Sequence, residues 1–154
     1  MLSIRRILAP TDFSEHACSA LAYARSFAEQ YGAELHLLNA VEPTVFPTEA
    51  GLTSMGMMTL DTELEEAAQR GMRELYGRPE LEGLKVTTAV THGRASSAIL
   101  QYAEENGIDL IVIATHGRTG LEHLLFGSTA ERVVRESPCP VLTVRPKEMA
   151  EKKK

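Results

Sequence analysis

The chain has 154 residues, of which 44% are hydrophobic and 24% are charged, and its formal net charge is -5 at pH 7. This length and composition predict one soluble globular domain and exclude a fibrous or mainly disordered polypeptide. The acidic balance argues against nonspecific nucleic-acid binding, because such binding needs basic residues that neutralise phosphates.

Cysteine usage and the N-terminal segment restrict the class of protein further. Cys18 and Cys139 lie far apart and fit no metal-ligand spacing, so neither a disulfide framework nor a zinc site is expected. No apolar run approaches the ~18 to 20 residues of a membrane span. Arg5, Arg6 and Asp12 interrupt the N-terminal segment, unlike in a signal peptide. The sequence therefore predicts a cytoplasmic protein that does not cross a membrane.

The chain begins with a predicted strand, a helix and a second strand. Residues 4–9 (IRRILA) predict the first strand, which Pro10 stops. Ser14 then fits a helix N-cap, apolar residues recur at helical spacing through residue 28, and Gly32 closes the helix. Residues 34–41 (ELHLLNAV) predict the second strand.

An irregular segment, residues 41–58, interrupts this alternation. It is longer than most connections, which indicates either a lid or a contact surface. Its methionines either cover a ligand or partner or pack onto the nearest core; they are Met55, Met57 and Met58. A helix capped by Asp61 and ending near residue 75 is expected next, and residues 85–90 predict the third strand.

The alternation then resumes as far as a fifth strand. Residues 95–105 predict a third helix, and residues 110–114 (LIVIA) predict a strand without polar residues, which should be buried on both faces. Residues 128–136 predict the last helix, and residues 141–144 (VLTV) the last strand.

This order of elements predicts a doubly wound α/β fold: a five-stranded parallel sheet with helices on both faces and right-handed crossovers. We expect a single domain over residues 1–146. Residues 147–154 (KEMAEKKK) are expected to form a charged, flexible tail.

In such sheets, ligands bind outside the carboxyl ends of the strands, where neighbouring crossovers leave in opposite directions. That rule selects residues 10–12, residues 40–41 and residues 114–120. An ionised Asp12 can accept hydrogen bonds from ribose hydroxyls. The alternative is that Asp12 only helps to cap the first helix.

The segment 114–129 (ATHGRTGLEHLLFGST) carries the main binding signal. Gly117 and Gly120 permit close approach of the backbone, and Gly127 with Ser128 opens the last helix. Amide groups and the helix dipole can therefore converge there on a phosphate. Ser128 can also be an ordinary N-cap, and the two roles are compatible.

Other reactive residue types have simpler interpretations. His116 and His123 fit no metal-ligand spacing and are expected to face solvent. Cys139, between two prolines, is expected to be a small buried apolar residue. No GxSxG elbow, HExxH motif or other pairing of nucleophile and base occurs, so a fast dedicated enzyme is not predicted.

The glycine pattern fits neither a P-loop, because Ser128 stands where GxxxxGK[ST] has its lysine, nor the GxGxxG fingerprint. It resembles the nucleotide-binding members of the universal stress protein family, which carry Gly, two residues, Gly, nine residues, and then Gly followed by Ser or Thr. Gly117, residues 118–126 and Gly127 with Ser128 match this pattern, whereas Ala114 replaces the first glycine. The segments APTDFSE, ATHGRTG, GSTAERVV and SPCPVLTVR extend the resemblance over almost the whole domain.

The resemblance implies ATP as the ligand. Mg²⁺ can accompany the nucleotide, because this ion is usually held largely by phosphates and water. It implies that Asp12 holds the ribose, that Ala40 lines the adenine pocket and that the glycine segment binds the phosphates, with Ala114 tolerated because it is small. The complete expected set is Pro10, Thr11, Asp12, Ala40, Ala114, His116, Gly117, Arg118, Thr119, Gly120, Gly127, Ser128 and Thr129.

Three functions remain open at this stage. The first is a stress-response sensor or switch that binds ATP and hydrolyses it slowly or not at all. The second is a dimeric interaction module that needs no nucleotide, and the third is an ATP-using phosphotransferase. The resemblance also implies the strand order 3-2-1-4-5, which leaves residues 141–144 at a sheet edge and predicts a homodimer through that edge.

Overall fold

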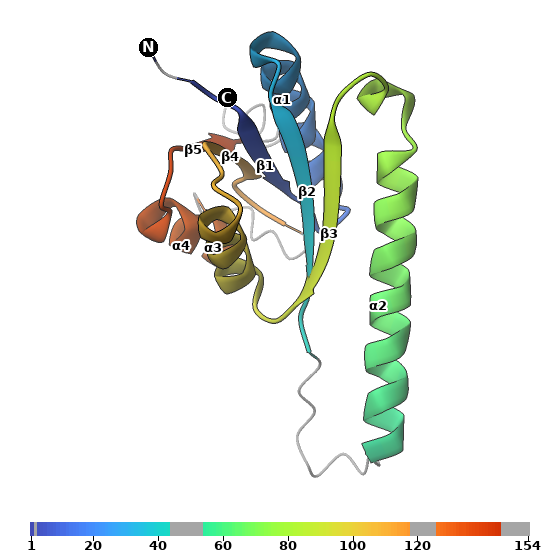
Figure 1. Cartoon of the computed structure of the whole chain (residues 1–154). Helices are drawn as coiled ribbons and strands as arrows, with labels where there is room; N and C mark the ends of the chain where they lie inside the picture. The colour runs from blue at the N-terminus through green and yellow to red at the C-terminus, as the bar shows by residue number, and fades with distance from the viewer. Residues whose placement is uncertain (2, 44–53, 118–125, 146–154) are drawn as a thin grey trace, which may run out of the picture.

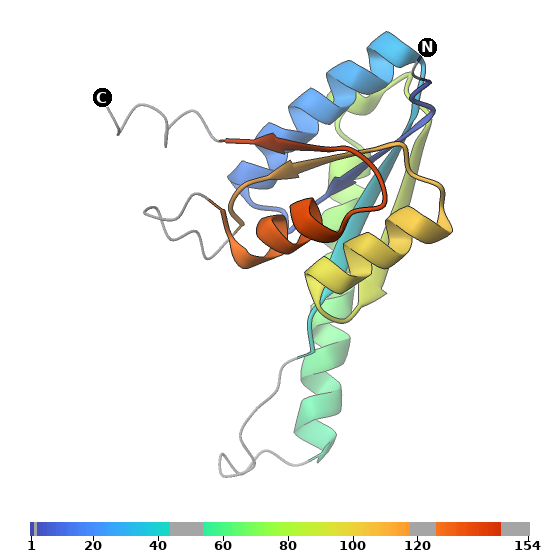
Figure 2. The ribbon, with the colours of Figure 1, turned by 90° about the vertical axis from the view of Figure 1, so that its left-hand side faces the viewer.

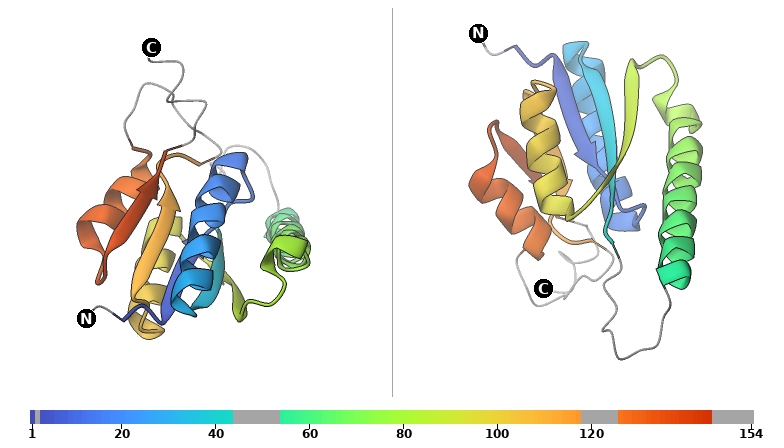
Figure 3. Two further views of the ribbon diagram at one scale, coloured as in Figure 1. Left: turned by 90° about the horizontal axis from the view of Figure 1, so that it is seen from above. Right: turned by 60° about the horizontal axis from the view of Figure 1, so that its bottom comes forward.

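In a computed structural model, the described residues form a five-stranded parallel sheet in the order β3-β2-β1-β4-β5, with helices on both faces (Figures 1 and 3). The structure describes residues 1, 3–43, 54–117 and 126–145, except for the side chains of residues 54–59. The strands are β1 Arg6–Pro10, β2 Glu34–Val41, β3 Val86–His92, β4 Leu110–Ala114 and β5 Val141–Val144. The helices are α1 Glu15–Tyr31, α2 Ser54–Tyr76, the 3-10 turn η2 Pro79–Leu81, α3 Ala95–Glu105 and α4 Ser128–Glu136. The predicted doubly wound α/β fold and its strand order are confirmed.

Strand side chains alternate between two apolar cores, one on each face of the sheet. The core beneath α1 and α2 includes Ile7, Leu35, Leu37, Val112, Met72 and Leu75. The core beneath α3 and α4 includes Leu8, Leu38, Ile111, Ile99 and Val133. Every residue of β4 is buried, as expected for a strand that helices cover on both faces.

The ends of α1 agree with the sequence prediction. The Ser14 hydroxyl accepts a hydrogen bond from the amide of Ala17 at 3.2 Å, so Ser14 is the N-cap. Gly32 ends the helix in the left-handed conformation, with a φ of 62°. The cap therefore fixes where the chain leaves β1 and enters α1.

The first strand begins and ends later than predicted, at Arg6–Pro10 rather than residues 4–9. The pairing of β1 with β4 covers only Ile7 and Leu8. Pro10 therefore lies beyond the β4 pairing, and its missing N–H group costs no hydrogen bond there. The strand can therefore include the proline as its last residue.

Helix α2 also differs from the prediction, because it begins at Ser54 rather than at Asp61. Asp61 lies inside the helix and does not cap it. Figure 2 shows that the first turns of α2 extend past the end of the sheet. Residues 61–67 are exposed, whereas Ala68, Met72 and Leu75 are buried, so the C-terminal half attaches the helix to the sheet.

Candidate functional site

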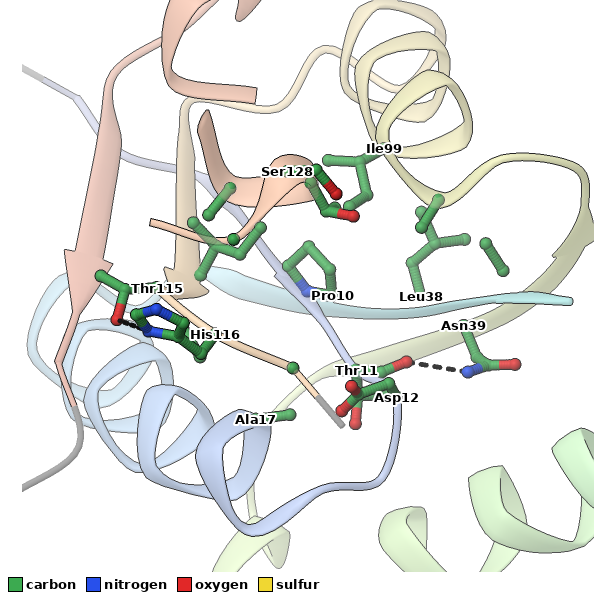
Figure 4. Close-up of a pocket in the computed structure, with 18 of the residues that line it drawn as sticks. Pro10, Thr11, Asp12, Ala17, Leu38, Asn39, Ile99, Thr115, His116 and Ser128 are labelled. Carbon is green, nitrogen blue, oxygen red and sulfur yellow. Dashed lines mark hydrogen bonds between the residues drawn. The ribbon is translucent and has the colours of Figure 1, made fainter. Parts of the chain in front are cut away.

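A cavity of about 420 Å³ lies at the carboxyl ends of β1, β2 and β4 (Figure 4). Strand β1 has β2 on one side and β4 on the other, so the cavity lies where the crossovers diverge. The predicted residues that the structure describes all line it: Pro10, Thr11, Asp12, Ala40, Ala114, His116, Gly117, Gly127, Ser128 and Thr129. Arg118, Thr119 and Gly120 lie outside the described residues.

A hydrogen-bonded turn after β1 presents Asp12. Oδ1 of Asp12 accepts the amide of Ser14 at 3.0 Å, and the Thr11 hydroxyl accepts the amide of Phe13 at 3.0 Å. From β2, the side-chain amide of Asn39 donates to the Thr11 carbonyl at 2.8 Å. Since Ser14 is the helix cap, Asp12 orders the turn instead of capping α1.

Gly117 lies directly beside this carboxylate. A Cβ atom at Gly117 would lie 2.6 Å from Oδ2 of Asp12. That distance is too short for any two non-bonded atoms of this kind, so only glycine leaves room for Asp12 in its observed position. The structure therefore brings together two residues that are far apart in the sequence.

The start of α4 faces the same cavity. Gly127 is the N-cap and provides no side-chain hydrogen bond, so Ser128 is the first helical residue and not the cap. The first intrahelical bond runs from the amide of Glu131 to the Gly127 carbonyl at 3.0 Å. The amides of residues 128–130 precede that bond, so they are directed outward from the helix end, where its dipole favours an anion.

The prediction that His116 faces solvent is wrong. His116 is only 3% exposed, and its Nδ1 lies 3.1 Å from the Thr115 hydroxyl. In Figure 4 the imidazole lies beside Thr115 and points away from Asp12. The amide of Thr115 donates to the Val144 carbonyl at 3.0 Å, which continues the β4–β5 pairing and keeps the chain inside the protein past Ala114. His123 lies outside the described residues.

Ala114, the departure from the glycine pattern, pairs with Val144 at the end of β4. It is 9% exposed, and its side chain belongs to the core beneath α1 and α2. The added methyl group is therefore accommodated by core packing.

Sequence reasoning missed much of the cavity wall. Its apolar part is supplied by Ala17, Leu38, Ala95, Ile99, Ile113 and Ala130, and further polar groups come from Asn39 and Glu42. Asn39 was detectable as a polar residue near the carboxyl end of β2, next to the expected residues 40–41. The wall from α3 carried no local signal, because only the packing of α3 against the sheet brings it to the site.

Three hydrogen bonds hold α3 in place beside the cavity. Oε1 of Glu42 accepts the amide of Ala95 at 2.9 Å, and this bond caps α3, whose N-cap residue Arg94 makes no side-chain cap. The guanidinium of Arg132 in α4 donates to the hydroxyls of Ser96 at 3.2 Å and Ser97 at 2.9 Å. The two bonds of Arg132 join α3 to α4, the two helices that flank the cavity.

The described residues contain no group of three or more His, Cys, Asp or Glu side chains arranged to hold a metal ion. Within the same ranges, no helix has the length and apolar content that a membrane crossing requires.

The model of the universal stress protein family matches residues 3–145. The chain belongs to the universal stress protein family. It is 36% identical over 142 residues to universal stress protein MJ0531 of Methanocaldococcus jannaschii, covering 92% of this chain and 82% of that protein. With universal stress protein MJ0577 of the same organism it shares 31% identity, covering 93% of this chain and 96% of the relative.

Solved structures of universal stress proteins share the fold. UspA from Lactobacillus plantarum superposes with a TM-score of 0.83 at 26% identity, covering 94% of this chain and 100% of that one. The structure of MJ0577 gives a TM-score of 0.81 at 32% identity, covering 94% and 98%. A universal stress protein in complex with cAMP has the same fold, with a TM-score of 0.69 at 22% identity over 93% of this chain and 98% of that one.

Proposed function

We propose that this universal stress protein binds an adenine nucleotide, ATP, and acts as a stress-response sensor or switch with slow or no hydrolysis. The observation that carries the proposal is the placement of Asp12 and the start of α4 at one cavity. A carboxylate suits ribose hydroxyls, which are hydrogen-bond donors. A helix N-terminus without a side-chain cap suits phosphate.

The size and walls of the cavity also fit a nucleotide. Its volume of about 420 Å³ lies within the range of small-molecule sites. Leu38, Ala40 and Ile99 supply apolar surface for a planar base, while Asp12 and residues 128–130 supply the polar contacts. Mg²⁺ would be held mainly by the phosphates and water, so it requires no separate cluster of protein carboxylates.

Two other functions remain as alternatives. A dimeric interaction module of this fold would not need the open N-terminus of α4. An ATP-using phosphotransferase would need a base positioned to activate a second substrate. We extend the proposal to a cytoplasmic homodimer joined through Val141–Val144.

The proposal is tested by measuring what the purified protein binds. Chromatography of the heat-released supernatant should detect adenine nucleotide, and calorimetry of stripped protein should show saturable ATP binding. Replacing Asp12 by Ala should weaken ATP binding by roughly tenfold or more, as expected when a charged hydrogen-bonding group is lost. Absence of ATP binding by the wild-type protein would refute the proposal. Rapid turnover of ATP that a site mutation abolishes would favour the alternative of an ATP-using enzyme.

A further inference from the structure

Phe13, the residue after Asp12, has an unusual backbone conformation. Its φ is 63°, which makes it the one non-glycine residue with a positive φ in the part of the chain that the structure describes. In the left-handed region, the Cβ of an L-residue approaches a carbonyl oxygen, and bulky residues rarely adopt it. Contacts elsewhere must therefore hold Phe13 in this conformation.

Two of these contacts are visible. The amide of Phe13 donates to the Thr11 hydroxyl at 3.0 Å. Its ring packs against the core beneath α1 and α2, with the ring edge directly over Gly71 of α2. A Cβ at Gly71 would lie 2.9 Å from Cζ and 3.0 Å from both Cε atoms of Phe13.

Gly71 is itself an unfavourable choice for the middle of a helix, because glycine has the largest conformational entropy to lose. Its φ is not positive, so its backbone does not require glycine. The neighbouring residues Ala68, Met72 and Leu75 are buried and seat this part of α2 on the sheet. What Gly71 provides is space for the ring of Phe13.

We infer that Gly71 and Phe13 are positioning residues for Asp12, so that α2 controls the nucleotide site through one ring contact. None of the described residues that line the cavity comes from α2. A side chain at Gly71 would push against a ring that the core prevents from swinging freely. The displacement would pass to the strained turn that presents Asp12. The inference rests on the proposed function for its effect on binding.

The test compares Gly71→Ala with Gly77→Ala, a matched glycine just beyond the end of α2. A Cβ at Gly77 would lie 3.4 Å from the Arg73 carbonyl oxygen and 3.8 Å from that of Glu74, which are ordinary contacts. We expect Gly71→Ala to weaken ATP binding about tenfold, equivalent to about 1.4 kcal/mol, and Gly77→Ala to leave it unchanged. Inorganic triphosphate, which has no ribose for Asp12, should bind equally to both variants.

A second experiment, a double-mutant cycle, distinguishes a positioning effect on Asp12 from a general loss of stability. In a Phe13→Leu background, Gly71→Ala should cause no further loss of ATP affinity, because the ring is gone. The amide NMR signals of Asp12 and Ser14 should shift in Gly71→Ala and stay in place in Gly77→Ala, whether or not ATP is present. Unchanged signals, or a loss of affinity that persists in the Phe13→Leu background, would overturn the inference. Failure of the wild-type protein to bind ATP would instead count against the proposed function.

Discussion

Gly117 is held against Asp12: a Cβ at position 117 would lie 2.6 Å from Oδ2 of the carboxylate. From the sequence, we predicted that Gly117 is a glycine because the backbone there approaches a ligand closely. The structure adds a second reason, since the glycine also leaves room for a protein side chain. Gly117 therefore has two roles: it leaves room for the carboxylate of the proposed ribose contact, and it is the first glycine of the segment proposed to bind the phosphates.

This contact predicts the effect of adding a single methyl group. Gly117→Ala should displace the Asp12 carboxylate and weaken ATP binding by roughly ten- to a hundredfold, the range expected for losing a charged hydrogen bond. Calorimetric titration measures the change. In an Asp12→Ala background the same substitution should cost much less, because the clashing oxygens are absent. Equal losses in the two backgrounds would contradict the steric explanation.

Restoring the glycine of the family pattern should not improve binding. The side chain of Ala114 packs in the core beneath α1 and α2. Ala114→Gly should therefore lower the free energy of unfolding by about 1 kcal/mol, because a buried methyl group is lost and the unfolded chain gains freedom. ATP affinity should stay the same. Urea denaturation and calorimetry on the same preparation test both parts, and a clear gain in affinity would show that the methyl group narrows the site.

Stability should fall in acid because of a polar cluster around His36. His36 is 5% exposed, and its Nδ1 lies 2.9 Å from the Tyr102 hydroxyl. Burial lowers the pKa of His36 below 6.5, and this outweighs the opposing attraction of Glu34. The unfolded chain therefore binds a proton that the folded protein does not. The resulting stability is present above about pH 6.5 and is lost as the pH falls below it.

Glu34 adds a second acid-sensitive step. Hydrogen bonds from Lys85 and Thr87 lower the pKa of Glu34 from 4.5 to about 2, so its contribution is lost as the pH falls through that interval. Urea denaturation at a series of pH values should show both steps. His36→Phe should remove the upper step and leave the lower one. If the unfolding free energy of the wild-type protein does not change between pH 7 and pH 5, the assignment to His36 is wrong.

The proposed dimer can be tested at a backbone group. The carbonyls of Pro140 and Val144 accept hydrogen bonds from β4. Backbone groups alternate in direction along a strand, so the amide of Thr143, one residue before Val144, points away from β4 at the sheet edge. Thr143→Pro removes this donor and should shift a homodimer toward monomer in light scattering. Thr143→Val keeps the amide and should remain dimeric. A wild-type protein that scatters as a monomer at micromolar concentration would rule out this interface.

The sequence by itself determined the fold class and most element boundaries. Residues 34–41, 95–105, 110–114, 128–136 and 141–144 were predicted with the bounds that the structure has. Ser14 and Gly32 were predicted as the caps of α1, and both are confirmed. These features depend on hydrophobic period and on cap chemistry, which act over a few neighbouring residues.

Only the tertiary structure decided the details of the site. The burial of His116 depends on the pairing of the chain after β4 with β5. The contact of Gly117 with Asp12 and that of Gly71 with Phe13 join segments more than fifty residues apart, and so depend on how the loops and helices pack against the sheet. A glycine in the sequence indicates that space or backbone freedom is needed, but packing alone determines which side chain occupies that space.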